Sequence, residues 1–200
     1  MEAPEWRSRM ILIDDDIIFK LAKFGHIEPF KGSNVQPASY DVTLMNTIKK
    51  RQPFHYEDGS TESIDRLMRN GVYYDGLTHE LHNGNMIEER FDKYWLKPGE
   101  FILGSTNEYI KLPANLAARF EGKSSLGRIG LTTHITAGFI DPGFEGTITL
   151  EIKNDNDVPI LLHADQPIGQ LCFYALTGVP HDTYDKKGHY NKQTGPTEAK

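Results

Sequence analysis

Three stretches of the sequence contain residue types that suit nucleotide chemistry. The first, residues 121–128, places one lysine, two serines and one arginine around two glycines. Hydroxyls, backbone amides and guanidinium groups bind phosphate because each anionic oxygen accepts charge-assisted hydrogen bonds. The spacing is not that of a Walker loop. A solvated surface turn has the same composition and is the commoner case, so residue types alone leave both interpretations open.

The second stretch, residues 137–146, is rich in glycine and holds Asp141 between an apolar pair and a proline. Glycines allow the backbone to approach a ligand closely, and an aspartate fixed in a turn can accept a hydrogen bond from a sugar hydroxyl. The simpler alternative is a β-turn in which Asp141 only caps the chain. The stretch therefore indicates a binding turn only in combination with other motifs.

The third stretch, residues 147–153, alternates polar and apolar residues with a period of two. This pattern predicts a strand that carries Ile148, Leu150 and Ile152 on one face and Thr147, Thr149 and Glu151 on the other. An exposed strand carboxylate is common. If the polar face lines a closed pocket instead, burial raises the pKa of the Glu151 carboxyl and makes it a proton acceptor and donor near neutral pH.

Composition limits the possible partners and cofactors. The 22 basic and 28 acidic residues give a net charge of -6, which disfavours nucleic acid and anionic membranes as partners because the long-range field repels phosphate. No run approaches the ~18 apolar residues that span a bilayer, and no signal peptide is evident, so we expect a cytoplasmic protein. The lone cysteine, Cys172, predicts a buried thiol and excludes the thiolate-ligated zinc site of common nucleobase deaminases.

The elements that must position these stretches are mostly strands. A length of 200 residues fits one domain. Residues 11–24 predict an amphipathic helix that Gly25 ends, residues 40–44 a strand, and residues 49–97 short hairpins and loops. Later strands recur about every ten residues, as in a sandwich or barrel, at 101–105, 109–112, 116–121, 131–137, 146–154, 159–163 and 168–176. Residues 177–200 predict a mobile tail unless contacts fasten it.

Taken in order, these motifs resemble the dCTP deaminase family, and especially its dUMP-forming branch, which combines deaminase and dUTPase activities. The resemblance covers nearly the whole chain, only loosely between residues 51 and 95, and rests on residues 10–17, 35–44, 122–131, 136–151 and 168–171. It implies a mostly β protomer of the dUTPase-like type, a distorted β-barrel or jelly-roll with one or two short helices. It also implies a homotrimer with active sites at subunit interfaces, over which the tail at 177–200 closes.

The resemblance assigns roles to individual residues. Ser124 and Arg128 match the serine and arginine beside the base, and Asp141 matches the aspartate that meets the deoxyribose, the counterpart of the water-activating aspartate of dUTPases. Backbone groups of residues 135–137, Ala137 among them, hold the base edge and the water. The other substrate-binding residues that the resemblance implies are Lys123, Ser125, Leu126, Gly127, Thr149, Leu150, Gln170, Tyr184, Tyr190 and Gln193.

The implied activity is hydrolytic deamination of dCTP without zinc, followed by pyrophosphate release to give dUMP for thymidylate synthesis. Glu151 matches the catalytic glutamate, which takes a proton from a water at C4 of cytosine and delivers it towards N3. Magnesium is expected only as the counter-ion of the triphosphate. Two departures bear on the branch: His189-Tyr190 stands where the family has Lys-Tyr, and Ala137-Gly138 where the deaminase-only branch has Ala-His.

Several functions remain open at this point. The protein could be a monofunctional deaminase that releases dUTP, or a deaminase of dCMP, since a neutral His189 would hold a γ-phosphate more weakly than a lysine. A plain dUTPase would use Asp141 and have no need of Glu151, so the glutamate ten positions after the aspartate argues against it. A non-enzymatic nucleotide-binding jelly-roll protein is a further alternative, because fold alone does not fix function.

Overall fold

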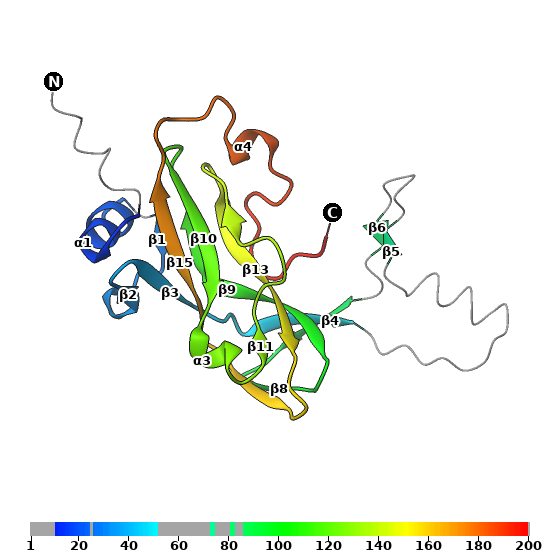
Figure 1. Ribbon diagram of the computed structural model, residues 1–200. Helices are drawn as coiled ribbons and strands as arrows, with labels where there is room; N and C mark the ends of the chain where they lie inside the picture. The colour runs from blue at the N-terminus through cyan, green and yellow to red at the C-terminus, as the bar shows by residue number, and fades with distance from the viewer. Residues whose placement is uncertain (1–10, 25, 52–72, 75–80, 83–85, 200) are drawn as a thin grey trace, which may run out of the picture.

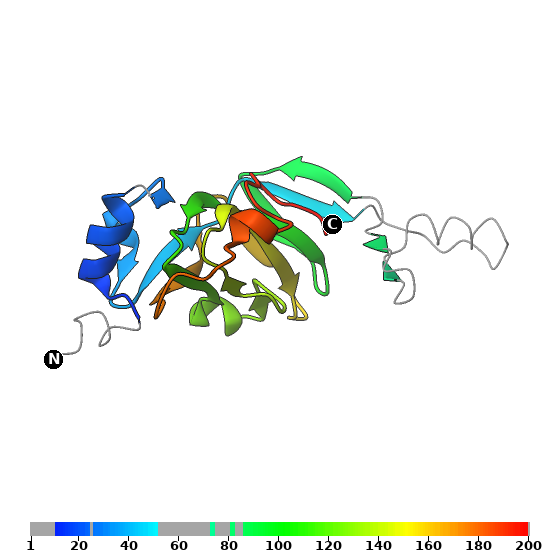
Figure 2. The ribbon, with the colours of Figure 1, turned by 90° about the horizontal axis from the view of Figure 1, so that it is seen from above.

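A computed structural model describes residues 11–24, 26–51, 73–74, 81–82 and 86–199 (Figure 1). The first element is a short helical segment, α1 (Asp14–Asp16) followed by the π-helix η2 (Ile17–Ala22). Ile17 and Leu21, four positions apart, are fully buried in the core. Figures 1 and 2 show the segment at the side of the sheets away from the C-terminus. The predicted helix is thus confirmed but shorter, and Gly25 lies outside the described residues.

The first sheet has six strands and contains the strand that carries Glu151. Its order is β11-β13-β9-β4-β7, and β1 pairs with the C-terminal end of β9. All of these pairings are antiparallel. The strands are β11 (Leu131–Thr132), β13 (Glu145–Asn154), β9 (Phe101–Lys111), β4 (Thr47–Arg51), β7 (Met86–Arg90) and β1 (Ile27–Glu28).

The second sheet has five antiparallel strands in the order β12-β10-β15-β3-β2. They are β12 (Phe139–Ile140), β10 (Leu116–Gly122), β15 (Pro167–Ala175), β3 (Ser39–Thr43) and β2 (Val35–Gln36). Two further pairs join β8 (Lys93–Leu96) to β14 (Ile160–His163) and β5 (Tyr73–Tyr74) to β6 (Leu81–His82). The remaining short helices are η3 (Gly32–Asn34), α3 (Ser124–Gly127) and α4 (Tyr184–Lys187).

One cluster of buried side chains joins both sheets. It includes Ile102 and Ile152 from the first sheet and Phe120 and Phe173 from the second, each exposed by 2% or less. The prediction of a mostly β protein with few short helices is confirmed. No closed barrel is found among the described strands, because the edge strands of each sheet do not pair with one another. None of the helices within the described ranges is long and apolar enough to span a bilayer.

Two strand predictions differ from the structure. The sequence predicts separate strands at 101–105 and 109–112, but β9 runs unbroken through the polar residues between them. Glu108 is fully buried there, and its carboxylate accepts hydrogen bonds from the Thr43 amide at 2.8 Å and the Thr43 hydroxyl at 2.9 Å. Burial raises the pKa of this carboxyl. The strand predicted at 131–137 is wrong beyond Thr132, where the chain enters bends and irregular structure.

Contacts with β13 fasten the described part of the tail. The Thr147 amide donates to the Gln193 carbonyl at 2.9 Å, and the Gln193 side-chain amide donates back to the Thr147 carbonyl at 2.8 Å. Gly146, with a φ of 148°, leaves room for this approach, since a Cβ there would lie 3.0 Å from the Gln193 carbonyl oxygen. Figure 1 shows the tail descending from α4 beside β13 towards β4.

Candidate active site

Glu151 lies on β13 in the interior of the first sheet, opposite Leu103 of β9. Its neighbours Leu150 and Ile152 are fully buried, so the alternation of the strand directs Glu151 to the other face, where it is half-buried. The Oε2 atom of Glu151 accepts a hydrogen bond from the Ile135 amide at 2.8 Å. This bond fixes the orientation of the carboxylate and leaves its second oxygen for other chemistry.

A bulge near the start of β13 changes the predicted alternation. The register shifts between Thr147 and Thr149, so that Ile148 is half-buried and lines the same cavity as Thr149 and Glu151. The Ile148 amide donates to the Thr106 hydroxyl at 3.0 Å. The sequence places Ile148 with the buried face of the strand, and the extra residue in the bulge is the reason for the difference.

Asp141 begins a tight turn against which α4 packs. The Phe144 amide donates to the Asp141 carbonyl at 3.2 Å, and the Tyr184 amide donates to the Pro142 carbonyl at 2.8 Å. Gly143 has a φ of 84°, and a Cβ at this position would lie 2.7 Å from the Asp185 carboxylate. The glycine therefore permits the close approach of α4, while the Asp141 side chain remains exposed at the cavity.

These elements enclose a cavity of about 540 Å³. The predicted site residues that line it are Glu151, Asp141, Ala137, Thr149, Tyr184, Tyr190 and Gln193. Most of the other described lining residues are apolar, and Arg51 is the one cation among them. A largely apolar cavity with a few convergent polar groups is the usual form of a small-molecule site.

The residues predicted at 123–128, together with Gln170, lie apart from this cavity within the chain, whereas the predicted triphosphate-binding residues Tyr184 and Gln193 line it. The Lys123 ammonium bonds to the Asp41 carboxylate at 2.7 Å, and Gln170 accepts a hydrogen bond from the Ser39 hydroxyl at 3.2 Å. The exposed members of the group are Ser124, Ser125, Gly127 and Arg128, at α3 and its C-terminal end. None of these residues lines the Glu151 cavity. Within one chain, the Glu151 cavity and the predicted binding residues at 123–128 are therefore separate.

Two predicted substrate-binding residues direct their side chains into the protein. Leu150 is fully buried in the core, and Leu126 is partly buried against it. Leu150 pairs with Gly104 on β9. A ligand in the cavity would therefore meet the backbone of Leu150 rather than its side chain.

The segment before β12 is packed too tightly for a side chain at position 138. A Cβ on Gly138 would lie 2.9 Å from the Phe120 carbonyl oxygen and 3.3 Å from the His134 ring. His134 itself packs edge-on against the Phe120 ring, with 5.5 Å between centroids. The backbone conformation around Ile135 and Ala137 therefore depends on glycine at position 138. A larger residue there would force the backbone or its neighbours to move.

Some cavity residues carry no signal in the sequence. Arg51 lies at the edge of the loosely matched region, and Thr197 and Ala199 lie beyond the last motif of the tail. Only the long-range contacts of the tail with β13 bring the latter two to the cavity. In the described parts of the chain, no group of three or more His, Cys, Asp or Glu side chains is arranged to hold a metal ion.

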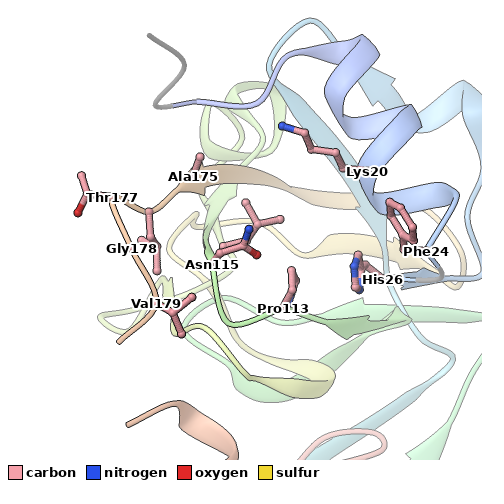
Figure 3. A pocket seen from close by; sticks show the side chains of 11 residues that line it. Lys20, Phe24, His26, Pro113, Asn115, Ala175, Thr177, Gly178 and Val179 are labelled. Carbon is pink, nitrogen blue, oxygen red and sulfur yellow. The ribbon is translucent and has the colours of Figure 1, made fainter. Parts of the chain in front are cut away.

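A second cavity, also about 540 Å³, lies between the end of η2, the β9–β10 turn and the end of β15. Figure 3 shows Lys20, Phe24 and His26 facing Gly178 and Val179 across it. Burial lowers the pKa of His26, and its Nδ1 atom is buried with no hydrogen-bond partner among the described residues. No carboxylate is among the described residues that line this cavity.

The fold and the Glu151 cavity together define a mostly β protein with a small-molecule site. A solved structure, the 2'-deoxycytidine 5'-triphosphate deaminase from Agrobacterium tumefaciens, matches the fold with a TM-score of 0.59 at 24% identity, over 83% of this chain and 48% of that one. This chain therefore spans about half of the length of that structure. The similarity at this level concerns the fold alone.

Sequence comparison is more specific. The family described as dCTP deaminase-like matches residues 11–176. Proteins named "dCTP deaminase, dUMP-forming" are similar to this chain in Bifidobacterium longum, at 43% identity over 96% of this chain and 94% of the relative, and in Streptomyces coelicolor, at 41% identity over 96% and 95%. The chain belongs to the dCTP deaminase-like family, which confirms the resemblance identified from the motifs.

Proposed function

We propose that this protein converts dCTP to dUMP by hydrolytic deamination followed by release of pyrophosphate. The names of the relatives at 41–43% identity support this proposal. The observation that carries it is Glu151, a carboxylate held by the Ile135 amide inside a largely apolar cavity. A plain dUTPase would leave this glutamate without a role.

In the deamination step, Glu151 accepts a proton from the water that attacks C4 of cytosine and delivers it to N3. Glu151 then transfers the hydroxyl proton of the tetrahedral intermediate to the 4-amino nitrogen, so the C4–N bond breaks, ammonia leaves and the C4 carbonyl of uracil forms. The Ile135 amide holds one carboxylate oxygen at 2.8 Å, so the other oxygen is presented in a fixed direction. The backbone at Ala137 lies beside the same cavity, where it can hold the base edge.

In the second step, a water attacks the α-phosphorus and the bond from this phosphorus to the α–β bridging oxygen breaks, so that dUMP and pyrophosphate form. This step requires a positioned sugar and a bound triphosphate. Asp141 lines the cavity and accepts a hydrogen bond from the deoxyribose hydroxyl in this proposal, while Tyr184, Tyr190 and Gln193 approach from the tail. Gly138, which stands where the deaminase-only branch has histidine, supports the dUMP-forming branch. The local packing fits this glycine, since a Cβ at this position would lie 2.9 Å from the Phe120 carbonyl oxygen. Magnesium would enter with the triphosphate and neutralise part of its charge.

The active site would be shared between protomers of a homotrimer. The described lining of the Glu151 cavity contains one cation, Arg51, whereas Lys123 and Arg128 lie elsewhere on the same chain. A triphosphate needs several charge-assisted hydrogen bonds, which a neighbouring copy could supply through its residues 123–128. Ser124 and Arg128 of that copy would then face the base bound beside Glu151.

A mixing experiment tests the shared site. Glu151→Gln and Arg128→Ala variants, each inactive alone, are expected to recover part of the wild-type activity when co-expressed, since some mixed sites contain both intact residues. Glu151→Gln mixed with the Glu151→Gln, Arg128→Ala double variant is the matched control and is expected to remain inactive. Absence of recovery in isolated mixed oligomers contradicts a site built from two copies.

The products identify the reaction. The purified protein is incubated with dCTP, dCMP or dUTP in the presence of Mg²⁺, and the nucleotides are separated by chromatography. Conversion of dCTP to dUMP without free dUTP is expected. Accumulation of dUTP would indicate a deaminase alone, turnover of dCMP a monophosphate deaminase, and turnover of dUTP alone a dUTPase. A zinc chelator is expected to leave the rate unchanged.

A further inference from the structure

A row of side chains crosses the first sheet on the face that carries Glu151. Glu151 pairs with Leu103 on β9, and Leu103 pairs with Lys49 on β4. Directly paired residues share a face of a sheet, and neighbouring strands lie ~4.8 Å apart, so the backbones at Lys49 and Glu151 are separated by roughly 10 Å. A lysine side chain spans much of that distance.

The end of the tail crosses this row. The Gly195 amide donates to the Thr147 hydroxyl at 2.8 Å, and the Thr197 amide donates to the Thr149 hydroxyl at 3.1 Å. Beyond these bonds, the Glu198 carboxylate pairs with the Lys49 ammonium at 2.8 Å. The two side chains are exposed by only 34% and 24%, and Thr197 and Ala199 line the Glu151 cavity.

We propose that Lys49 and Glu198 are a positioning pair for Glu151. The pair anchors the end of the tail as one wall of the cavity, and it directs the Lys49 ammonium to the tail rather than to the catalytic carboxylate. Thr149 takes part through its bond to Thr197. The effect on the reaction rests on the proposed function, whereas the anchoring of the tail does not.

Other charged groups on this face have different surroundings. The Arg51 guanidinium lies over the Phe101 ring, 5.7 Å from its centroid, and the Lys153 ammonium pairs with Asp155. Glu88 pairs with Lys49 across β4 and β7 but is exposed, so solvent screens its attraction. Among the described residues that line the cavity, the other titratable groups besides Glu151 and Arg51 are Asp141, Tyr184 and Tyr190. Glu198 is thus the half-buried carboxylate that holds Lys49.

The charge of Lys49 matters because the reaction needs Glu151 to exchange a proton. A cation near a carboxylate stabilises the ionised form and makes it a weaker base. With the Glu198 carboxylate removed, the Lys49 ammonium turns to Glu151. With the ammonium removed instead, the Glu198 carboxylate is left without its cation on the face of the sheet that carries Glu151 and has the opposite effect.

Two variants of the full chain test the pair. Glu198→Gln is expected to lower kcat/KM for dCTP by roughly two- to fivefold and to move the acid limb of the pH–rate profile to lower pH by on the order of half a unit. Lys49→Gln is expected to move the limb to higher pH. In both variants the Gly195 and Thr197 amides are expected to exchange with solvent faster than in the wild type, as measured by hydrogen exchange.

Lys50→Gln is the matched control, because Lys50 is the neighbouring residue on β4 and pairs with Glu89 on the opposite face. It is expected to leave the limb and both amides unchanged. Limbs that shift in the same direction in Glu198→Gln and Lys49→Gln would overturn the electrostatic role, and unchanged amide exchange would overturn the anchor. A wild-type protein that does not deaminate dCTP would refute the proposed function, while the exchange data would still decide the anchor.

Discussion

The cavity beside Glu151 and the cavity beside His26 have the same volume, about 540 Å³, but their walls differ in chemistry. The first is formed by one face of a strand, a glycine-rich turn and the tail, and a backbone amide holds its carboxylate at 2.8 Å. The second is formed by the ends of several elements, and its buried imidazole nitrogen has no partner among the described residues. Volume alone is therefore a poor guide to function, and polar groups fixed by the backbone are a better one.

The largest effect is expected at Glu151, in the first cavity. A Glu151→Gln variant keeps an oxygen that can accept the Ile135 hydrogen bond but cannot exchange a proton, so deamination of dCTP is expected to fall ~1,000-fold or more while nucleotide binding persists. Product chromatography and calorimetry measure the two quantities. Glu28→Gln, at an exposed carboxylate of β1, is the control. Normal turnover in the Glu151→Gln variant would show that the reaction does not take place in this cavity.

A smaller loss is expected at Asp141, which lines the Glu151 cavity but does not exchange the proton. The Asp141→Ala variant lacks the charged group that accepts a hydrogen bond from the sugar hydroxyl. Its kcat/KM is therefore expected to fall roughly 10- to 100-fold, mainly because KM rises. Steady-state kinetics with dCTP measure the effect. Asp157→Ala, in an exposed turn, is the matched control. An unchanged KM would show that Asp141 does not contact the substrate.

Two glycines, one near each cavity, are expected to differ in how much a methyl group changes the stability of the protein. Gly138→Ala places a methyl group 2.9 Å from the Phe120 carbonyl oxygen, and overpacking of this kind costs about 1–3 kcal/mol of the free energy of unfolding. Gly178→Ala, in the His26 cavity, meets no atom within 4 Å and is expected to be neutral by comparison. Denaturant unfolding of both variants checks the difference. Equal stabilities would show that the backbone near Ala137 can relax.

The smallest effect is expected at His26, and it concerns pH rather than activity. Burial lowers the pKa of His26 in the folded protein below the value of 6.5 that applies to the unfolded chain, so the unfolded chain binds the proton more tightly. The contribution of His26 to stability is therefore present above pH 6.5 and is lost as the pH falls through the folded-state pKa.

Thermal unfolding of His26→Gln between pH 7 and pH 5 is expected to show a smaller loss of Tm than in the wild type, with deaminase activity within about twofold. Activity measured at pH 7 serves as the internal control. A large loss of activity in this variant would give the second cavity a role in the reaction and abolish the contrast between the two.

The sequence predicted the parts of the site that depend on local patterns. The alternation around Glu151 placed this side chain on the face opposite Leu150 and Ile152, where the structure has it. The turn at Asp141 followed from its glycines and proline in the same way. Both patterns involve residues that are close in the sequence. The roles of Glu151 and Asp141 were then predicted from the resemblance of the ordered motifs to those of the family.

Predictions failed where distant contacts decide the structure. Residues between 105 and 109 are polar and indicated a break, but Glu108 is bonded to Thr43, 65 positions away. The tail carries no apolar period, yet its hydrogen bonds with Thr147 and Thr149 fasten it to β13. The bulge at Ile148 likewise depends on a distant contact, because the Ile148 amide donates a hydrogen bond to the Thr106 hydroxyl on β9. No local pattern encodes these pairings, so a single sequence does not show them.

The strand that carries Glu151 also constrains how its length can vary in evolution. Leu150 and Ile152 lie in the core while Glu151 faces the cavity. The face on which each side chain lies is set by its position along the strand, because successive side chains alternate between the two faces. Loss of one codon between the bulge and Glu151 would turn the carboxylate inward and an isoleucine outward, whereas loss of two would keep both on their faces. Gaps in this part of the gene are therefore expected to occur in pairs of codons.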